Sequence, residues 1–176
     1  METKLKLKDI CGNIEYKLKY IDSFGYISVA KTLNTDGFID KNYSTIPDKT
    51  AQIKPILRPL SDLYKEISHN GEKFIPIVRL AESSENKTLK KCNCWKLRIK
   101  ENPLLEDFKY TAVSETGITF AYRKYGFFCA DDEITNFEIN QVELFDLLNE
   151  WKIDYRGLIE KGLAVSVHDF KEVIYS

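Results

Sequence analysis

The sequence predicts an α+β fold, with antiparallel strands and hairpins in the N-terminal and middle parts and helices collected near the C-terminus. Short segments with two-residue alternation recur up to residue 122 and are separated by turn residues, which is typical of half-buried strands. A sustained helical periodicity follows only over residues 141–151. The 10 Phe, 10 Tyr and 2 Trp supply enough large side chains for a core, which argues against global disorder.

The length of 176 residues predicts a single domain over residues 1–176, and the polar loop 82–92 is the candidate for an internal boundary. The 26 Lys and Arg nearly balance the 27 Asp and Glu, which leaves a net charge of −1. This balance excludes the strongly basic proteins that coat nucleic acid through charge alone.

The N-terminal part reads as a hairpin. Apolar and charged residues alternate over 14–20, Asp22 to Gly25 supply a turn, and residues 26–30 return as the second strand. A second turn at 34–37 precedes a short third strand.

The middle part begins with an extended segment, because Pro55 and Pro59 each disfavour a helical residue before them. A short helix capped by Ser61 then runs to a turn at 69–71. Residues 74–78 read as an edge or bent strand, since they contain Pro76.

Two further strand regions follow the polar loop. Residues 95–100 alternate and predict a strand with a basic outer face, and residues 108–122 predict a hairpin. Near the C-terminus, Asn140 begins an N-x-x-E cap for the helix 141–151. Asp154 is expected to cap a second helix that closes at Gly162, and a terminal strand covers 163–167.

The N-terminal sequence and the cysteines indicate a cytoplasmic protein. Lys recurs at every second position from Lys4 to Lys8, which prevents a signal-peptide core. No run of about 18 apolar residues is present, so no membrane-spanning helix and no membrane partner are expected. The four cysteines read as reduced thiols, because a chain of this size needs no disulfides.

Three stretches, residues 54–63, 70–76 and 155–164, resemble a family of small uncharacterised proteins encoded by phages and prophages of gut-type bacteria. Residues 1–50 and 82–135 show no such likeness. The resemblance implies a mobile-element accessory protein expressed in the cytoplasm of a bacterial host, and it supplies no activity, cofactor or catalytic residue. Each stretch also has a structural explanation, because its prolines and glycines serve turns and helix ends.

No complete catalytic, metal or cofactor motif is present, so no such residues are assigned. One residue separates Cys92 from Cys94, which is too few for a zinc knuckle, and Cys129 follows two phenylalanines as a small hydrophobe does. Nucleophile elbows and phosphate-binding loops are also absent. An enzyme that uses Cys129 or His168 remains a third hypothesis.

Opposite charges are segregated along the chain. Residues 126–151 contain no Lys or Arg, and their acidic residues include Asp131, Asp132, Glu133, Glu143, Asp146 and Glu150. Residues 86–100 contain no acid, and their candidate nucleic-acid ligands are Lys90, Lys91, Trp95, Lys96, Arg98 and Lys100.

The charge pattern leads to the main functional hypothesis, a non-enzymatic accessory protein that binds a host protein through its acidic C-terminal surface and can thereby inhibit it. The alternative is a nucleic-acid-binding protein, in which the basic segment contacts phosphates and Trp95 stacks on a base. A purely structural explanation is that the two segments face each other or are solvated. The sequence does not determine the oligomeric state.

Overall fold

The computed structural model describes residues 18–21, 27–34, 37–40, 54–84, 95–99, 110–123, 126–130 and 137–170. Their contacts divide the chain into two compact units, which we call unit 1 (residues 1–60 and 148–176) and unit 2 (residues 61–147). Each unit is described by itself, and the single domain expected over residues 1–176 stays a prediction.

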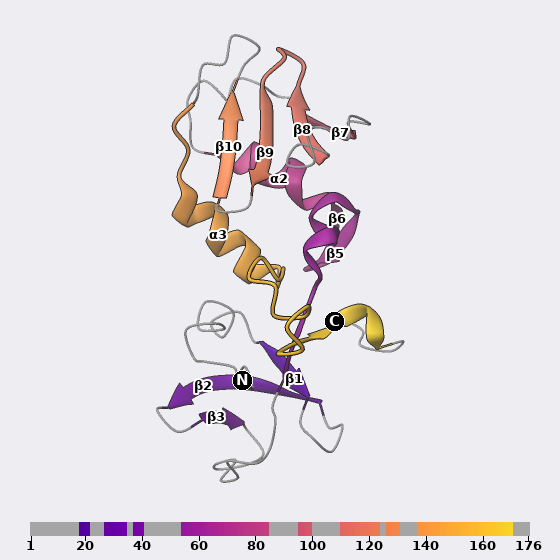
Figure 1. The fold of residues 1–176 in the computed structure, drawn as a ribbon, viewed down its shortest axis with the longest axis vertical. Helices are drawn as coiled ribbons and strands as arrows, with labels where there is room; N and C mark the ends of the chain where they lie inside the picture. The colour runs from indigo at the N-terminus through magenta and orange to yellow at the C-terminus, as the bar shows by residue number, and fades with distance from the viewer. Residues whose placement is uncertain are drawn as a thin grey trace. The chain divides into compact units, whose positions relative to one another are not determined.

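Unit 1 contains a five-stranded sheet in the order β11-β4-β1-β2-β3, of which β1, β2 and β3 are labelled in Figure 1. Its strands are β1 (Lys19–Ile21), β2 (Ile27–Asn34), β3 (Gly37–Asp40), β4 (Lys54–Leu57) and β11 (Val165–Ser166). The β1–β2 pair is antiparallel and sets Tyr20 opposite Ser28, which confirms the predicted N-terminal hairpin in its described part. β11 is the exception to the antiparallel expectation, because it pairs with β4 in parallel.

The sheet of unit 1 is continued by an isolated parallel bridge between Arg58 and Ile153. The Arg58 amide donates to the Lys152 carbonyl at 2.8 Å, and the Asp154 amide donates to the Arg58 carbonyl at 2.8 Å. Among the described residues of this unit, the buried apolar side chains are Leu18, Tyr20, Ile56, Leu57, Leu148, Trp151, Ile153, Leu158, Ala164 and Val167. The chain after residue 150 therefore packs into the core that the N-terminal strands begin.

Unit 2 contains an antiparallel four-stranded sheet in the order β10-β9-β8-β7 (Figure 1). Its strands are β7 (Trp95–Ile99), β8 (Tyr110–Ser114), β9 (Thr119–Arg123) and β10 (Gly126–Ala130). The β8–β9 hairpin confirms the one predicted over 108–122. Its turn is closed by the Ser114 amide, which donates to the Ile118 carbonyl at 2.9 Å, and Gly117 adopts a φ of 85° there.

Helix α2 (Pro76–Ser83) packs against β7, β8 and β9 through its buried residues Ile77, Leu80 and Ala81. The sequence predicted a strand at 74–78, and this prediction is wrong. Pro76 occupies the start of the helix, where a missing backbone N–H costs nothing and the fixed φ suits the helical conformation.

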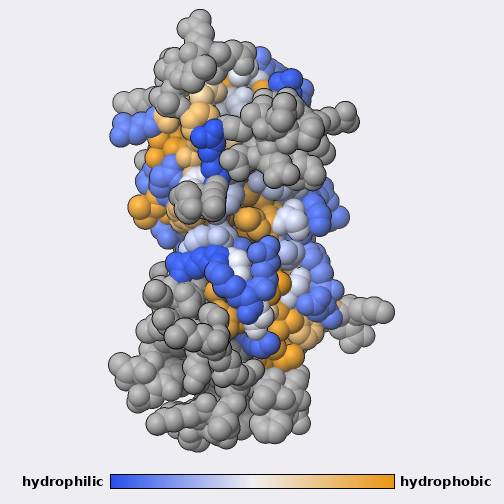
Figure 2. Space-filling view, viewed as in Figure 1, coloured by the Kyte–Doolittle hydropathy of each residue, from blue (hydrophilic) through white to orange (hydrophobic). Residues whose placement is uncertain are grey.

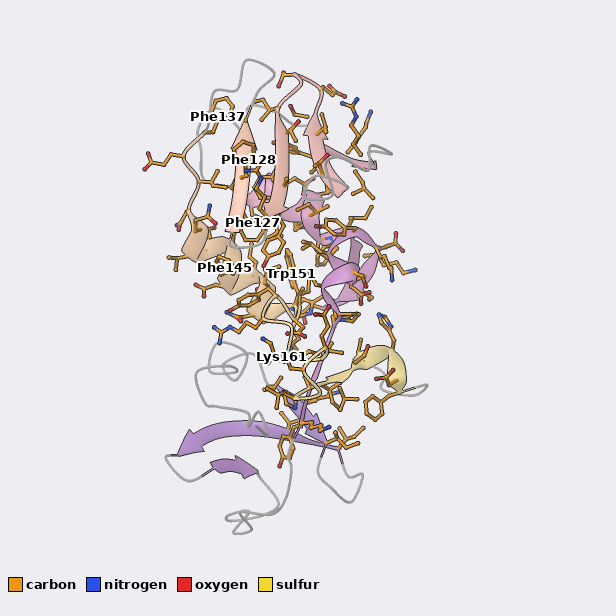
Figure 3. The ribbon with its side chains drawn as sticks, viewed as in Figure 1. Phe127, Phe128, Phe137, Phe145, Trp151 and Lys161 are labelled. Carbon is orange, nitrogen blue, oxygen red and sulfur yellow. The ribbon has the colours of Figure 1, made fainter. Side chains whose placement is uncertain are left out.

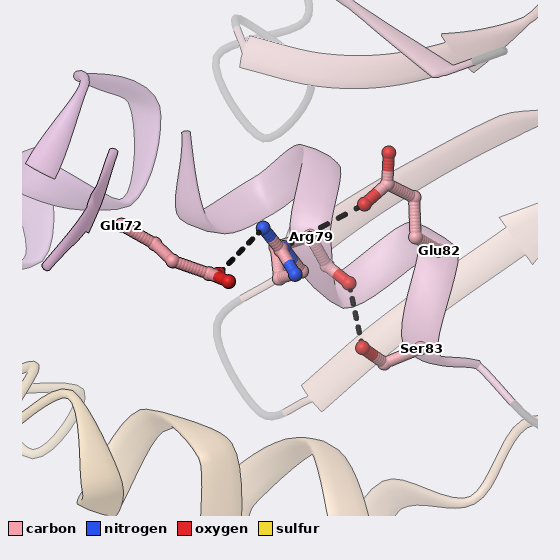
Figure 4. Close-up of polar contacts among 4 residues, drawn as sticks. All are labelled: Glu72, Arg79, Glu82 and Ser83. Atoms are coloured by element: carbon pink, nitrogen blue, oxygen red, sulfur yellow. Dashed lines mark hydrogen bonds and ion pairs between the residues drawn. The ribbon is translucent and has the colours of Figure 1, made fainter. Parts of the chain in front are cut away.

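A small antiparallel hairpin of β5 (Ile67–His69) and β6 (Glu72–Phe74) precedes α2. Arg79 of α2 connects the helix to this hairpin, because its Nη2 lies 3.2 Å from Glu72 Oε2 on β6 (Figure 4). Within α2, its Nε lies 3.7 Å from Glu82 Oε2. Its guanidinium also lies over the Phe74 ring, 5.0 Å from the centroid. These groups are substantially exposed, so they orient the hairpin more than they stabilise it.

The predicted α+β class is confirmed at the level of antiparallel sheets combined with helices. The described residues contain two α-helices, of which α2 lies mid-chain, so the expected collection of helices near the C-terminus is not clearly seen. The helix expected after Pro59 is a short 3-10 helix, Leu60–Tyr64, followed by β5. The helix expected from Asp154 is absent, because residues 154–164 form turns in which Gly157 has a φ of 66°.

Candidate protein-binding surface on helix α3

Helix α3 (Gln141–Glu150) begins where the N-x-x-E pattern predicts. Asn140 caps it, because its Oδ1 accepts from the Glu143 amide at 3.4 Å and its carbonyl accepts from the Leu144 amide at 3.3 Å. The predicted helix over 141–151 is therefore confirmed, to within one residue at its end.

One side of α3 is buried. Leu144 and Leu148 are almost fully inaccessible to solvent. Within unit 2, the half-buried ring of Phe145 lies 5.4 Å from that of Phe127 on β10, with the two planes inclined at 58° (Figure 3). This aromatic contact attaches the start of α3 to the edge of the sheet and fixes which residues of the helix face outward.

The outward side of α3 is acidic. Successive helical residues are rotated by about 100°, so Val142, Asp146, Glu150 and Glu143 follow one another around a single arc opposite Leu144 and Leu148. Val142 is 71% exposed, the largest value for a large hydrophobic residue in the part of the chain that the structure describes. We call these four residues the α3 acidic face.

The negative charge of the α3 acidic face is not balanced within the helix. Neither Glu143 nor Asp146 forms an ion pair with any residue that the structure describes. The last turn contains no basic residue, although positive charge is favoured at a helix C-terminus. The Lys152 ammonium donates to the backbone carbonyl of Glu150 at 3.2 Å, and its positive charge is attracted by the Glu150 carboxylate.

The end of α3 has a left-handed closing residue. Lys152 has a φ of 59°, its amide donates to the Asn149 carbonyl at 3.0 Å, and the Ile153 amide donates to the Leu148 carbonyl at 2.9 Å. This pattern is a Schellman motif, which usually places glycine at the position of Lys152. Burial and, to a smaller extent, the positive charge of Arg58 lower the pKa of Lys152 from 10.5 to about 8.

Arg58, Lys152 and Asp154 form a buried charged group in unit 1 that the sequence did not reveal. The Asp154 carboxylate accepts from the Leu158 amide at 2.9 Å and from the Ile159 amide at 2.7 Å. Sequence reasoning identified Asp154 as a cap and expected a helix behind it. The carboxylate does accept hydrogen bonds from backbone amides, as a cap does, but the residues that follow it form turns and not a helix.

The structure places half of the predicted acidic residues. Glu143 and Asp146 lie on α3, and Glu150 is its last residue. Asp131, Asp132 and Glu133 lie outside the described residues. The part of the acidic surface that can be assigned is therefore the α3 acidic face alone.

The predicted basic ligands are also placed in part. Lys96 and Arg98 are exposed on β7, and neither forms an ion pair with a described residue. The Trp95 ring is only 7% exposed and packs edge-on against Phe120 at 6.3 Å. Lys90, Lys91 and Lys100 lie outside the described residues. No described ion pair therefore joins the basic and acidic segments.

The remaining candidates for chemistry lie in separate surroundings. Cys129 is buried in unit 2, and His168 is exposed in unit 1. Within the described ranges, no group of three or more His, Cys, Asp or Glu is placed to hold a metal ion. None of the described helices is long and apolar enough to cross a membrane.

Hydrophilic and hydrophobic residues are intermixed over the coloured part of the face that Figure 2 shows. A search of protein-family models, of curated proteins and of solved structures found no match to this chain.

Proposed function

We propose that this protein is a non-enzymatic phage-type accessory protein that binds a host protein in the bacterial cytoplasm through the α3 acidic face. The observation that supports the proposal is the pair of carboxylates of the half-buried Glu143 and the exposed Asp146, which form no ion pair with a described residue and lie beside the exposed Val142. A surface of this kind suits a basic partner, because uncompensated charge speeds encounter and an apolar residue supplies contact area.

The partner that this surface fits presents Lys or Arg side chains around a small apolar recess. The carboxylates then steer the approach of the partner, and burial of Val142 contributes the hydrophobic part of the binding energy. Binding of this type weakens with added salt, because exposed charges are screened over about 8 Å at physiological ionic strength. Occupying a basic surface of a host factor is a direct route to inhibiting it.

The second candidate function, nucleic-acid binding, is favoured by the exposed positions of Lys96 and Arg98 on β7. The burial of Trp95 against Phe120 counts against it, since base stacking on this ring needs an accessible face. With Trp95 held in the core, the described part of the basic segment offers two cations and no stacking platform.

The test is affinity capture from a bacterial lysate, with and without nuclease, using the wild-type chain and the variant Glu143→Lys/Asp146→Lys/Glu150→Lys. Capture of a protein partner by the triple variant is expected to fall by about tenfold or more, since three attractive charges become repulsive. The matched control is Glu115→Lys/Glu160→Lys/Asp169→Lys, which makes the same change in net charge at exposed acids elsewhere.

The control variant is expected to capture the partner as the wild type does. Urea denaturation of both variants verifies that the fold is retained. Undiminished capture by the α3 triple variant rejects the proposal. Capture that disappears after nuclease treatment instead supports the nucleic-acid alternative.

A further inference from the structure

The charged residues of strands β7 to β10 are all positive, and all of them lie on one face of the sheet in unit 2. Lys96 of β7 pairs with Val113 of β8, which in turn pairs with Thr119 of β9. Side chains alternate between the two faces along each strand, so Arg98 lies on the same face as Lys96, and Arg123 on the same face as Thr119. These four strands contain no Asp or Glu that could balance the charge on this face.

The opposite face of the sheet belongs to the core of unit 2. It carries the rings of Trp95, Phe120 and Phe127. Phe120 stacks on Phe127 with 5.7 Å between the centroids and meets Trp95 edge-on at 6.3 Å. The three cations therefore point away from this aromatic cluster, and all three are exposed.

An aromatic residue lies on the same face as the cations. Ala121 of β9 pairs with Phe128 of β10 (Figure 3), so the half-buried Phe128 ring is on the side of Arg123. The Arg123 guanidinium lies over this ring, 4.6 Å from its centroid. A guanidinium is a flat cationic group on which a nucleobase can stack, and it also attracts phosphate. We call Lys96, Arg98, Arg123 and Phe128 the basic sheet face.

Hydrogen bonds from the start of α3 fix the strand that carries Phe128. The Phe127 amide donates to Gln141 Oε1 at 2.8 Å, and Gln141 Nε2 donates to the Phe127 carbonyl at 2.8 Å. Gly126 leaves room for this contact, because a Cβ atom there would lie 2.9 Å from Gln141 Oε1. With β9 on its other side, β10 is held from both sides, so the position of the Phe128 ring is largely set before a ligand binds.

We propose that the basic sheet face binds single-stranded nucleic acid, with Lys96 and Arg98 on the phosphates and a base stacked on Arg123. Strands β7 and β10 are separated by three strand spacings, which is about 14 Å, so the ligand is a polymer and not a single nucleotide. A single strand fits because its bases are accessible for stacking, whereas the bases of a duplex are stacked inside it. An acidic protein would match the charges but would leave the stacking group unused.

This site goes beyond the proposed function and shares no residue with the α3 acidic face. It also differs from the nucleic-acid site expected from the sequence, because its stacking group comes from β9 and β10 and not from the buried Trp95. The net charge of the chain is −1, so attraction to phosphates has to come from a local patch of this kind.

The test is fluorescence anisotropy at low salt with the purified full chain and two labelled probes. One probe is an oligothymidine of about 12 nucleotides, and the other is an abasic strand of the same length. The oligothymidine is expected to bind about fivefold more tightly or better, because a stacked base adds to the phosphate contacts.

Two variants separate the stacking contact from the phosphate contacts. Arg123→Lys keeps the charge but removes the planar group, so oligothymidine binding should weaken by about fivefold or more. Its binding of the abasic strand should stay unchanged, which also shows that the variant folds. Lys96→Gln/Arg98→Gln is expected to weaken binding of both probes and to reduce the slope of log affinity against log salt by about 1.4.

The matched control is Lys65→Gln/Lys73→Gln, which removes two exposed cations of unit 2 that lie outside the four-stranded sheet. It is expected to bind both probes as the wild type does. Equal losses in the control and in Lys96→Gln/Arg98→Gln would overturn the proposal, because the attraction is then not localised on the basic sheet face.

The proposal is also overturned if the wild type binds neither probe, if it binds the abasic strand as tightly as oligothymidine, or if Arg123→Lys binds oligothymidine undiminished. Tighter binding of a duplex than of oligothymidine contradicts it as well. Full displacement of oligothymidine by polyglutamate at equal charge would indicate an acidic protein partner instead. Each of these results leaves the host-protein proposal in place, since the assay contains no partner protein.

Discussion

At the scale of single residues, Lys152 combines three features that rarely occur together. It has a left-handed backbone, it is buried, and its ammonium lies near Arg58. The side chain still contributes to the fold, because it donates to the Glu150 carbonyl and its methylene stem is covered. A positive charge at this position consequently lowers the free energy of unfolding, by an amount that depends on pH.

This effect predicts a specific pH dependence of stability. The pKa of Lys152 is lowered to about 8 in the folded chain by burial and by Arg58, whereas the unfolded chain retains a value near 10.5. Between these values the unfolded state binds more protons than the folded state, so the free energy of unfolding contributed by this group rises with pH. Below about pH 8 both states are protonated, and the destabilisation is fully present.

The measurement is urea denaturation of the wild type and of Lys152→Met between pH 7 and pH 10, with pH values chosen around the pKa of about 8. The wild type should gain stability relative to the variant above about pH 8, with a slope of at most about 1.4 kcal/mol per pH unit. Lys152→Met cannot titrate and serves as the reference for all other groups. A difference between the two that is independent of pH contradicts the prediction.

The burial of Lys152 and Arg58 could not be predicted from the sequence. Neither residue belongs to a motif, and a charged residue is on average exposed. Their burial results from the parallel bridge between Arg58 and Ile153, which joins segments far apart along the chain. Gln141 was missed for the same reason, because its partner Phe127 is reached only through the fold.

At the scale of elements, the turn segment 154–162 depends on one carboxylate. Asp154 is 5% exposed and accepts from the amides of Leu158 and Ile159. Removing the carboxylate leaves the backbone amides of Leu158 and Ile159 without their hydrogen-bond acceptor in a mostly buried setting. We expect Asp154→Ala to lower the free energy of unfolding by about 2–3 kcal/mol, as measured by urea denaturation.

Asp154→Asn is the matched variant, since it retains one side-chain acceptor of the same shape. Its loss of stability should fall between that of Asp154→Ala and zero. An alanine variant as stable as the wild type would show that water replaces the carboxylate at both amides.

Strands were easier to predict than helices in this chain. The alternation over 14–20 and 108–122 identified β1 and the β8–β9 hairpin, because a two-residue period with flanking turns is a local property. Pro76 misled the prediction, since proline suits both a strand edge and the first turn of a helix. The buried contacts of α2 with three strands decide between them, and these contacts are tertiary.

At the scale of the whole molecule, the division into two units predicts that a destabilising substitution in one unit mainly affects the stability of that unit. Ile56→Ala removes a buried side chain in unit 1, and Phe120→Ala removes one in unit 2. Substitutions of this size cost roughly 2–5 kcal/mol. Hydrogen exchange should accelerate mainly in β1, β4 and β11 for the first variant, and mainly in β7 to β10 for the second.

Each variant serves as the control for the other in this experiment. Equal acceleration in both sheets for both variants would contradict the prediction and would indicate one cooperative unit. That outcome would agree with the single domain expected from the length of the chain.

In the described residues the charge segregation read from the sequence is seen as two sets. The acidic set on α3 contains the exposed Asp146 and the half-buried Glu143 and Glu150, and the basic set on β7 contains the exposed Lys96 and Arg98. The two-residue period of β7 places Trp95 on the face opposite to Lys96 and Arg98, and the fold packs its ring against Phe120. The sequence therefore predicted where the charges lie along the chain, while the fold determines which of them have an apolar neighbour at the surface.

The fit between Gly126 and Gln141 also limits how this chain can diverge. A Cβ atom on residue 126 would lie 2.9 Å from Gln141 Oε1, so a side chain there displaces the flexible end of this glutamine from the Phe127 amide. The effect of a substitution at one of these positions therefore depends on the residue at the other.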